Sequence, residues 1–120
     1  MLDDEPMLPA YGRGCVTDLI PAILEPSDDD PSAVVGPEIV DAPAVVVLVF
    51  DGLGWNQLQE RASLAPTLAS MAGGAVTTVA PSTTATALTS ISTGVPPGQH
   101  GVVGYRIDVD GEVLNVLRWT

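Results

Sequence analysis

The sequence predicts an α/β fold with a mainly parallel sheet, and three observations support this. Residues 44–50 are an uninterrupted apolar run in which four of the seven positions are Val, which favours a strand over a helix. A run without alternation is typical of a strand buried on both faces, as in a parallel sheet covered by helices. Residues 75–80 are a second β-branched segment, and helical spacing of apolar residues lies between the two. Strand, helix and strand in this order predict parallel strands.

Composition agrees with this fold class and limits the partners. The chain has 120 residues, of which 46% are hydrophobic and only 4% aromatic, so we expect a core of Val, Ala, Leu and Ile. It contains four Arg, no Lys and fifteen Asp or Glu, for a net charge of -11. Because no basic patch can form, we expect neither nucleic acid polymers nor membranes as partners. A bound phosphate would need a metal ion, a helix N-terminus or a single Arg.

Residues 1–43 are expected to form an N-terminal arm, a helix and a polar linker. Apolar residues recur at helical spacing from Val16 to Leu24, and Thr17 or Asp18 can cap the start of that helix. The acidic run Asp28–Asp30 lacks the ligand spacing of a calcium loop and indicates a solvated linker. The first residues are acidic, and no apolar run is long enough for a signal peptide or a membrane span, so we expect a cytoplasmic location.

Residues 44–120 are expected to be the first part of a larger domain. Short helices are predicted around Trp55 and after Pro66, and a longer one from the hydroxyl-rich segment 82–84 to Gly94. A strand from residue 102 and the Asp110-Gly111 turn predict a hairpin. No turn or polar tail marks an end at residue 120, so we expect the chain to be truncated at its C-terminus.

Polar side chains follow both predicted parallel strands. Asp51 comes directly after the first strand, and Ser82-Thr83-Thr84 follow the second. Parallel strands place such residues at one edge of the sheet, where α/β proteins bind ligands. A hydroxyl at a helix N-terminus favours a bound phosphate, and a carboxylate beside it would require a bridging cation. A metal-assisted site is therefore predicted, while the alternative that Ser82 or Thr83 only caps the helix stays open.

Other candidate motifs give weaker signals. Gly52-Leu53-Gly54 resembles the start of a dinucleotide fingerprint, but Gln57 stands where its third Gly belongs. A chain without Lys cannot form a P-loop. For His100, the single histidine, a structural hydrogen-bonding role is favoured over metal ligation. Cys15, the single cysteine, is interpreted as a small buried residue, and the core is the favoured place for Trp55 and Trp119.

A series of segments from about Val45 to Tyr105 resembles the N-terminal part of the type I phosphodiesterase/nucleotide pyrophosphatase family, within the alkaline phosphatase superfamily. The resemblance implies the first part of a three-layer α/β/α sandwich with a mainly parallel sheet. The matching segments, in order, are Val47 to Leu53, Pro66-Thr67-Leu68, Pro81 to Thr86, Ser92-Thr93-Gly94 and Pro97 to Gly104.

The resemblance also implies a hydrolase with two zinc ions that acts on small phosphodiester or nucleotide substrates. Asp51 matches a zinc-binding aspartate of the family, and Thr84 matches its threonine nucleophile, which also contacts the metal. A zinc ion lowers the pKa of an attached hydroxyl, so that a threonine can attack phosphorus and form a phospho-enzyme that water hydrolyses. The oligomeric state is left open.

The chain departs from the family pattern in several places. Tyr105 stands where many members have an asparagine that holds a phosphate oxygen, and Ala85-Thr86 replace a Phe-Pro pair. The family's further Asp and His ligands are expected beyond residue 120, so the chain alone is expected to be inactive. Two alternatives remain, namely a catalytically dead remnant that acts as a binding or structural module, and a degenerate nucleotide-binding α/β domain.

Overall fold

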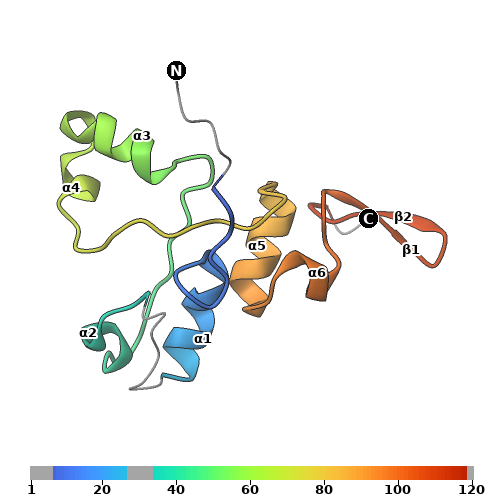
Figure 1. Cartoon of the computed structure of the whole chain (residues 1–120), viewed down its shortest axis with the longest axis horizontal. Coiled ribbons are helices and arrows are strands. Elements are labelled where there is room, and N and C mark those ends of the chain that lie inside the picture. Colours follow the sequence, from blue (N-terminus) through green and yellow to red (C-terminus); the bar gives the residue numbers. More distant parts are fainter. Residues whose placement is uncertain (1–6, 27–33, 119–120) are drawn as a thin grey trace. The chain divides into compact units, whose positions relative to one another are not determined.

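The computed structural model describes residues 7–26 and 34–118 (Figure 1). The acidic run Asp28–Asp30, the residues that precede position 7, and Trp119 lie outside this part of the chain. The described residues divide into two compact units, the first formed by those within Met1–Pro43 and Val76–Thr120 and the second by Ala44–Ala75. The predicted boundary at residue 44 between an N-terminal region and a catalytic domain stays a prediction.

The first unit is organised around α5, which spans Thr84–Thr93. The 3-10 turn η1 (Val16–Asp18) leads directly into α1 (Leu19–Leu24), and both pack against α5. The blue α1 ribbon therefore lies beside the orange α5 ribbon in Figure 1. The helix predicted from Val16 to Leu24 is thus present, with a 3-10 first turn. Short helices α2 (Pro37–Val40) and α6 (Pro97–His100) complete the helical part of this unit.

The core of the first unit is made of small residues. Its fully buried side chains come from the N-terminal segment, the approach to α5 and α5 itself, and are Cys15, Val79, Thr86 and Ser90. The prediction that Cys15 is a small buried residue is confirmed, since none of its surface is exposed. Two of these four residues carry hydroxyl groups, so this core depends on hydrogen bonds as well as on apolar contact.

Residues 10–16 pair with the chain that leads to α5. Cys15 forms a parallel bridge with Thr77, with Thr77 N–H donating to the Gly14 carbonyl at 2.9 Å and Val16 N–H donating to the Thr77 carbonyl at 2.9 Å. The Thr77 hydroxyl adds a contact by accepting the Ala10 N–H at 2.8 Å. The predicted strand at 75–80 is thus reduced to this one bridge, because the described residues offer it only a short, irregular partner.

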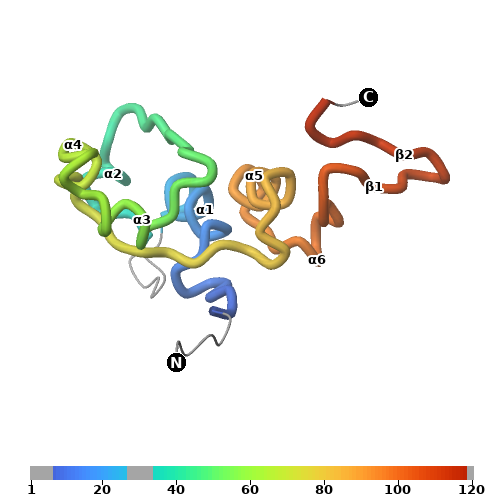
Figure 2. The backbone as a smooth tube through the Cα atoms, turned by 90° about the horizontal axis from the view of Figure 1, so that it is seen from above, coloured from blue at the N-terminus to red at the C-terminus, as the bar shows by residue number. Residues whose placement is uncertain are grey.

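The last part of the first unit is a two-stranded antiparallel hairpin. β1 (Arg106–Val109) pairs with β2 (Glu112–Asn115), with Ile107 opposite Leu114. Asp110 and Gly111 join them with φ angles of 54° and 87°, which two-residue hairpin turns require. The predicted hairpin is confirmed, although its first strand begins at Arg106 rather than at residue 102. Figure 2 shows the backbone running from α5 through α6 into the hairpin.

The second unit contains α3 (Trp55–Glu60), the 3-10 turn η2 (Ala62–Leu64) and α4 (Pro66–Ala69). Pro66 is the first residue of α4, as predicted. Trp55 is 40% exposed, so its placement in a core was wrong. Residues 44–50 belong to no strand, and the exposed fractions of Val46 and Leu48 are 82% and 73%.

The absence of a strand at 44–50 has a physical reason. A strand buried on both faces needs hydrogen-bonded neighbours and covering helices, and the described residues provide none for this segment. The described structure is a mixture of helices with a small antiparallel sheet, which is consistent with the α/β class. The parallel sheet and the three-layer sandwich stay predictions. No helix in the described ranges is both long and apolar enough to span a bilayer.

Candidate functional site

Thr84 is the first residue of α5 and is half-buried. The residue before it, Thr83, has the extended conformation of an N-cap (φ -75°, ψ 151°), so the helix begins where the sequence predicted. Amide groups in the first turn of a helix have no partner within the helix and point out from its N-terminus. Thr84 is therefore held at the positive end of a helix dipole, where an anionic oxygen is favoured.

The hydroxyl of Thr83 does not cap the helix. It forms a hydrogen bond of 2.8 Å with the hydroxyl of Thr86, whose side chain is fully buried, and makes no side-chain bond to the amides of the first turn. Thr83 is thus the N-cap by backbone conformation alone. Its contact with Thr86 fixes the chain immediately before Thr84 to the buried face of α5.

Helix α5 carries no charged side chain along its whole length. Its sequence is rich in Thr and Ser, and several of these hydroxyls donate to the carbonyl four residues earlier, as Thr89 does to Ala85 at 2.8 Å. At its other end, Gly94 has a left-handed conformation (φ 71°) and donates its N–H to the Ser90 carbonyl. Because this helix carries no cation, a negative charge at its N-terminus would be stabilised by the helix dipole and by charged groups on other parts of the protein.

Asp51 lies in a turn in the second unit. The Leu53 N–H donates to the Phe50 carbonyl at 3.3 Å, and Gly52 in the third turn position has a φ of 77°, as type II turns require. The turn leads to Gly54, the N-cap of α3. The side chain of Asp51 is exposed, so the turn presents the carboxylate at the surface of this unit.

The two predicted site residues lie in different units, Asp51 in Ala44–Ala75 and Thr84 in the unit around α5. Their sharing of one metal ion therefore stays a prediction. Within residues 7–26 and 34–118, no group of three or more His, Cys, Asp or Glu side chains is arranged to hold a metal ion. The role of Asp51 as a metal ligand likewise stays a prediction.

His100 makes two ring contacts that support the predicted structural role. Its Nε2 lies 2.8 Å from the Ser90 hydroxyl on α5, and its Nδ1 accepts the Val102 N–H at 3.0 Å. Burial of the ring lowers the pKa of His100 below its usual 6.5. The sequence did not identify Ser90 as the partner, although a hydroxyl on the buried face of a helix followed by a nearby histidine is a usable signal.

Asp18 is another buried polar residue, and its carboxylate takes part in a capping box at the start of η1, although it makes no cap bond to α1 itself. Its carboxylate accepts N–H groups of Gly12, Gly14 and Cys15 at 2.9–3.0 Å, and also the Thr17 hydroxyl. Burial raises the pKa of this carboxyl, but the hydrogen bonds outweigh burial and leave the pKa below 3.8. Asp18 therefore holds the loop of residues 12–15 that pairs with the approach to α5.

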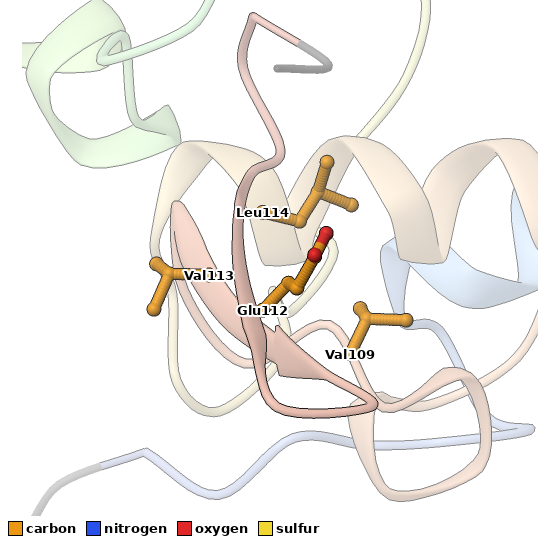
Figure 3. A pocket seen from close by; sticks show the side chains of 4 residues that line it. All are labelled: Val109, Glu112, Val113 and Leu114. Atoms are coloured by element: carbon orange, nitrogen blue, oxygen red, sulfur yellow. The ribbon is translucent and has the colours of Figure 1, made fainter.

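The hairpin carries a shallow depression of about 240 Å³ (Figure 3). Its lining residues are Val109, Glu112, Val113 and Leu114. Figure 3 shows Val113 on the opposite side of the strand from Leu114 and Glu112, as the alternation of a β-strand requires. Its one ionisable group is a carboxylate, so it does not suit a phosphate substrate.

Comparison with protein families assigns the chain to a known family. Residues 45–119 match the family model of type I phosphodiesterase / nucleotide pyrophosphatase, which is more than half of the chain. The chain belongs to this family. The type I phosphodiesterase / nucleotide pyrophosphatase family is a hydrolase family, and its name points to small nucleotide-type substrates. The match includes both Asp51 and Thr84 but begins after the N-terminal segment that pairs with Thr77. A search of curated proteins and a search of solved structures returned no match.

Proposed function

We propose that this chain supplies the nucleophile and one metal ligand of a zinc-dependent hydrolase of phosphodiester or pyrophosphate bonds. Thr84 is the nucleophile and Asp51 is the metal ligand. The observation that carries the proposal is the position of Thr84 as the first residue of α5, half-buried and directly after a cap residue whose hydroxyl is turned away to Thr86. The family match supports the reaction class.

The reaction follows from the chemistry of the hydroxyl. The Thr84 oxygen attacks phosphorus as the bond to the leaving oxygen breaks, and the hydroxyl proton passes to solvent or to a base. The resulting phosphothreonine is then hydrolysed by water, which restores the hydroxyl and releases phosphate or its monoester. The helix N-terminus stabilises negative charge on the phosphoryl oxygens, because its amides and dipole favour anions.

The residues present fit a zinc site in part. Zinc binds carboxylate oxygens, and Asp51 offers one at an exposed turn. A bound zinc pair supplies a lowered pKa for an attached hydroxyl and neutralises charge on the attacking and leaving oxygens. In this proposal Asp51 would hold the metal and Thr84 would supply the attacking hydroxyl, within the three-layer sandwich that the family resemblance implies. The remaining ligands would come from residues other than those described here.

The test replaces the nucleophile. The Thr84→Ala variant of the protein expressed from its full reading frame is expected to lose at least about a thousandfold of its activity on a chromogenic phosphodiester, because the covalent route is lost. Thr84→Ser keeps a hydroxyl and is expected to retain measurable turnover, and Ser82→Ala, at an exposed position before the helix, is the matched control. Thr84 is the first residue of α5 rather than its cap, and Ala is a good helix former, so folding and zinc content should change little.

Two results would contradict the proposal. If Thr84→Ala retained most of the activity, a neighbouring hydroxyl would be the better candidate for the nucleophile. If the zinc-loaded protein showed no turnover at all, a role as a binding module would be favoured. The 120-residue chain alone is expected to be inactive, because a two-metal site needs about six protein ligands and the described residues contain no group of three or more suitable side chains. Turnover by this chain, lost again in its Thr84→Ala variant, would show that it builds a complete site.

A further inference from the structure

The inference concerns the ring of His100, which lies at the end of α6 and connects two parts of the first unit. One ring nitrogen faces α5, where Ser90 is fully buried, and the other faces the backbone of the loop that follows α6. Gly101 between them has a left-handed conformation (φ 76°), so the chain reverses immediately after the histidine. The ring therefore spans the gap between the helix and the returning loop.

The two contacts determine which nitrogen carries the proton. The Val102 N–H can only donate, so Nδ1 at 3.0 Å must accept and carries no proton. A neutral ring then has its proton on Nε2, which donates to the Ser90 hydroxyl at 2.8 Å. A second proton on Nδ1 would bring two N–H groups together and would break the contact with Val102. The arrangement is thus compatible only with the neutral ring.

Within the described part of the chain, the elements around the ring offer no charge that would favour the protonated ring. Helix α5 has no ionisable residue, and α6 has none besides His100. The N-terminal elements that pack on α5 are η1 and α1, whose one ionisable residue is Asp18, and the Asp18 carboxylate already accepts backbone N–H groups. On the loop side, the guanidinium of Arg106 lies over the ring of Tyr105, at 5.6 Å from the centre of that ring. Burial lowers the pKa of His100, in agreement with this environment.

We propose that His100 is a positioning residue, which as a neutral ring protonated on Nε2 holds the loop of residues 101–105 against α5, the helix that begins with Thr84. Addition of a second proton releases the loop. The importance of this contact for catalysis rests on the function proposed above, because α5 is the element that presents Thr84. The contact itself belongs to the folded chain and is measurable without turnover.

The test uses nuclear magnetic resonance of the 120-residue chain, in which the single histidine makes the ring signals unambiguous. Two-bond proton–nitrogen spectra near neutral pH are expected to show an unprotonated Nδ1 and a protonated Nε2. When the pH is lowered, the ring should titrate below its usual pKa, and the Val102 amide signal should change with the same midpoint while the rest of the chain stays folded. These measurements need only the wild-type chain.

Variants separate positioning from general stability. In His100→Asn the side-chain oxygen can still accept the N–H two residues later, so hydrogen exchange at Val102 should stay slow, whereas in His100→Ala it should be about tenfold faster. Ser90→Ala removes the helix contact and is expected to speed exchange of the loop amides. Ser92→Ala on the exposed face of α5 is the matched control and should leave them unchanged.

Three results would overturn the inference. They are a ring protonated on Nδ1, a histidine titration that leaves the Val102 amide unaffected, and equal exchange at Val102 in the Asn and Ala variants. None of these readouts depends on Thr84. If Thr84→Ala kept its activity, the proposed reaction would be rejected while the role of His100 stayed intact. Likewise, a negative result for His100 would leave the proposed reaction untouched.

Discussion

Asp18 shows how one side chain can organise a loop that has no regular structure. Its carboxylate accepts the N–H groups of Gly12, Gly14 and Cys15, which lie before α1, and of these three residues Cys15 is buried. Bonds to a charged acceptor are stronger than those between neutral groups, so the loop of residues 12–15 depends on the ionised form. The same loop provides the backbone that pairs with Thr77.

The first prediction concerns Asp18 and pH. Because its folded pKa lies below the unfolded value of about 3.8, the ionised carboxylate stabilises the fold above that value, and this stabilisation is lost as the pH falls through the folded pKa. Asp18→Asn puts an amide group where two acceptor oxygens stood, and should lower the free energy of unfolding by about 1–3 kcal/mol at neutral pH. Urea unfolding at pH 7 and pH 3 measures both effects.

Asp41→Asn is the matched control, since Asp41 is exposed after α2. It should change the free energy of unfolding by less than about 0.5 kcal/mol. If Asp18→Asn were equally neutral at pH 7, or if its cost did not shrink at acid pH, the amide contacts of the carboxylate would not be what stabilises the loop.

At the scale of elements, α5 depends on how its C-terminus meets α1. Gly94 ends α5 in the left-handed conformation, and a Cβ built on it would lie 2.6 Å from Cγ of Pro21. Real Cβ atoms do not approach carbon so closely, and a proline ring has little freedom to move away. The glycine thus allows both the end of the helix and the contact between α1 and α5.

We expect Gly94→Ala to lower the free energy of unfolding by at least about 1–2 kcal/mol, the cost of the left-handed conformation, with the Pro21 clash in addition. Gly98→Ala within α6 is the control, because nothing lies within 4 Å of its Cβ position and its φ is negative. That change should be neutral or slightly stabilising. Chemical denaturation of both variants measures the difference, and equal stabilities would show that the helix end tolerates a side chain.

Elements set by local signals could be predicted from the sequence. The start and end of α5, the proline that opens α4 and the Asp110-Gly111 hairpin each follow from residues next to one another in the chain. The apolar run at 44–50 was predicted as a strand from the same kind of pattern, but strand formation needs partners distant in sequence. The contacts of Asp18 and of the Ser90–His100 pair form only where the backbone folds back on itself. The spacing of apolar residues along the sequence does not reveal such reversals. The grouping of Asp51 with Thr84 remains a prediction for the same reason.

At the scale of the whole molecule, exposed apolar surface and high negative charge have opposite effects on self-association. Val46, Leu48 and Phe50 are each more than half exposed, and the net charge of -11 repels other copies of the chain. Exposed apolar segments with free backbone edges favour association, while like charge prevents close approach. The balance between the two depends on salt.

The 120-residue chain should therefore self-associate as salt rises from about 0.01 M to about 1 M, since the Debye length falls from about 30 Å to about 3 Å. Val46→Glu should reduce this association. Val113→Glu, at an exposed position of the hairpin (67% exposed), should reduce it less. Sedimentation velocity at several salt concentrations measures the effect. A chain that stays monomeric at high salt, or equal effects of the two variants, would show that residues 44–50 do not drive association.

The pairing of residues 10–16 with Thr77 and Ala80 has a consequence for how the protein is made. The Ala10 N–H reaches a hydroxyl 67 residues later, and the Tyr11 hydroxyl accepts an N–H 69 residues later. Closing so long a loop is entropically costly and slow, so these contacts form late. A ribosome must have released residues through Ala80 before the first segment can make these contacts. Until then the N-terminal segment is accessible to chaperones and proteases, and a translational pause before residue 80 would prolong that exposure.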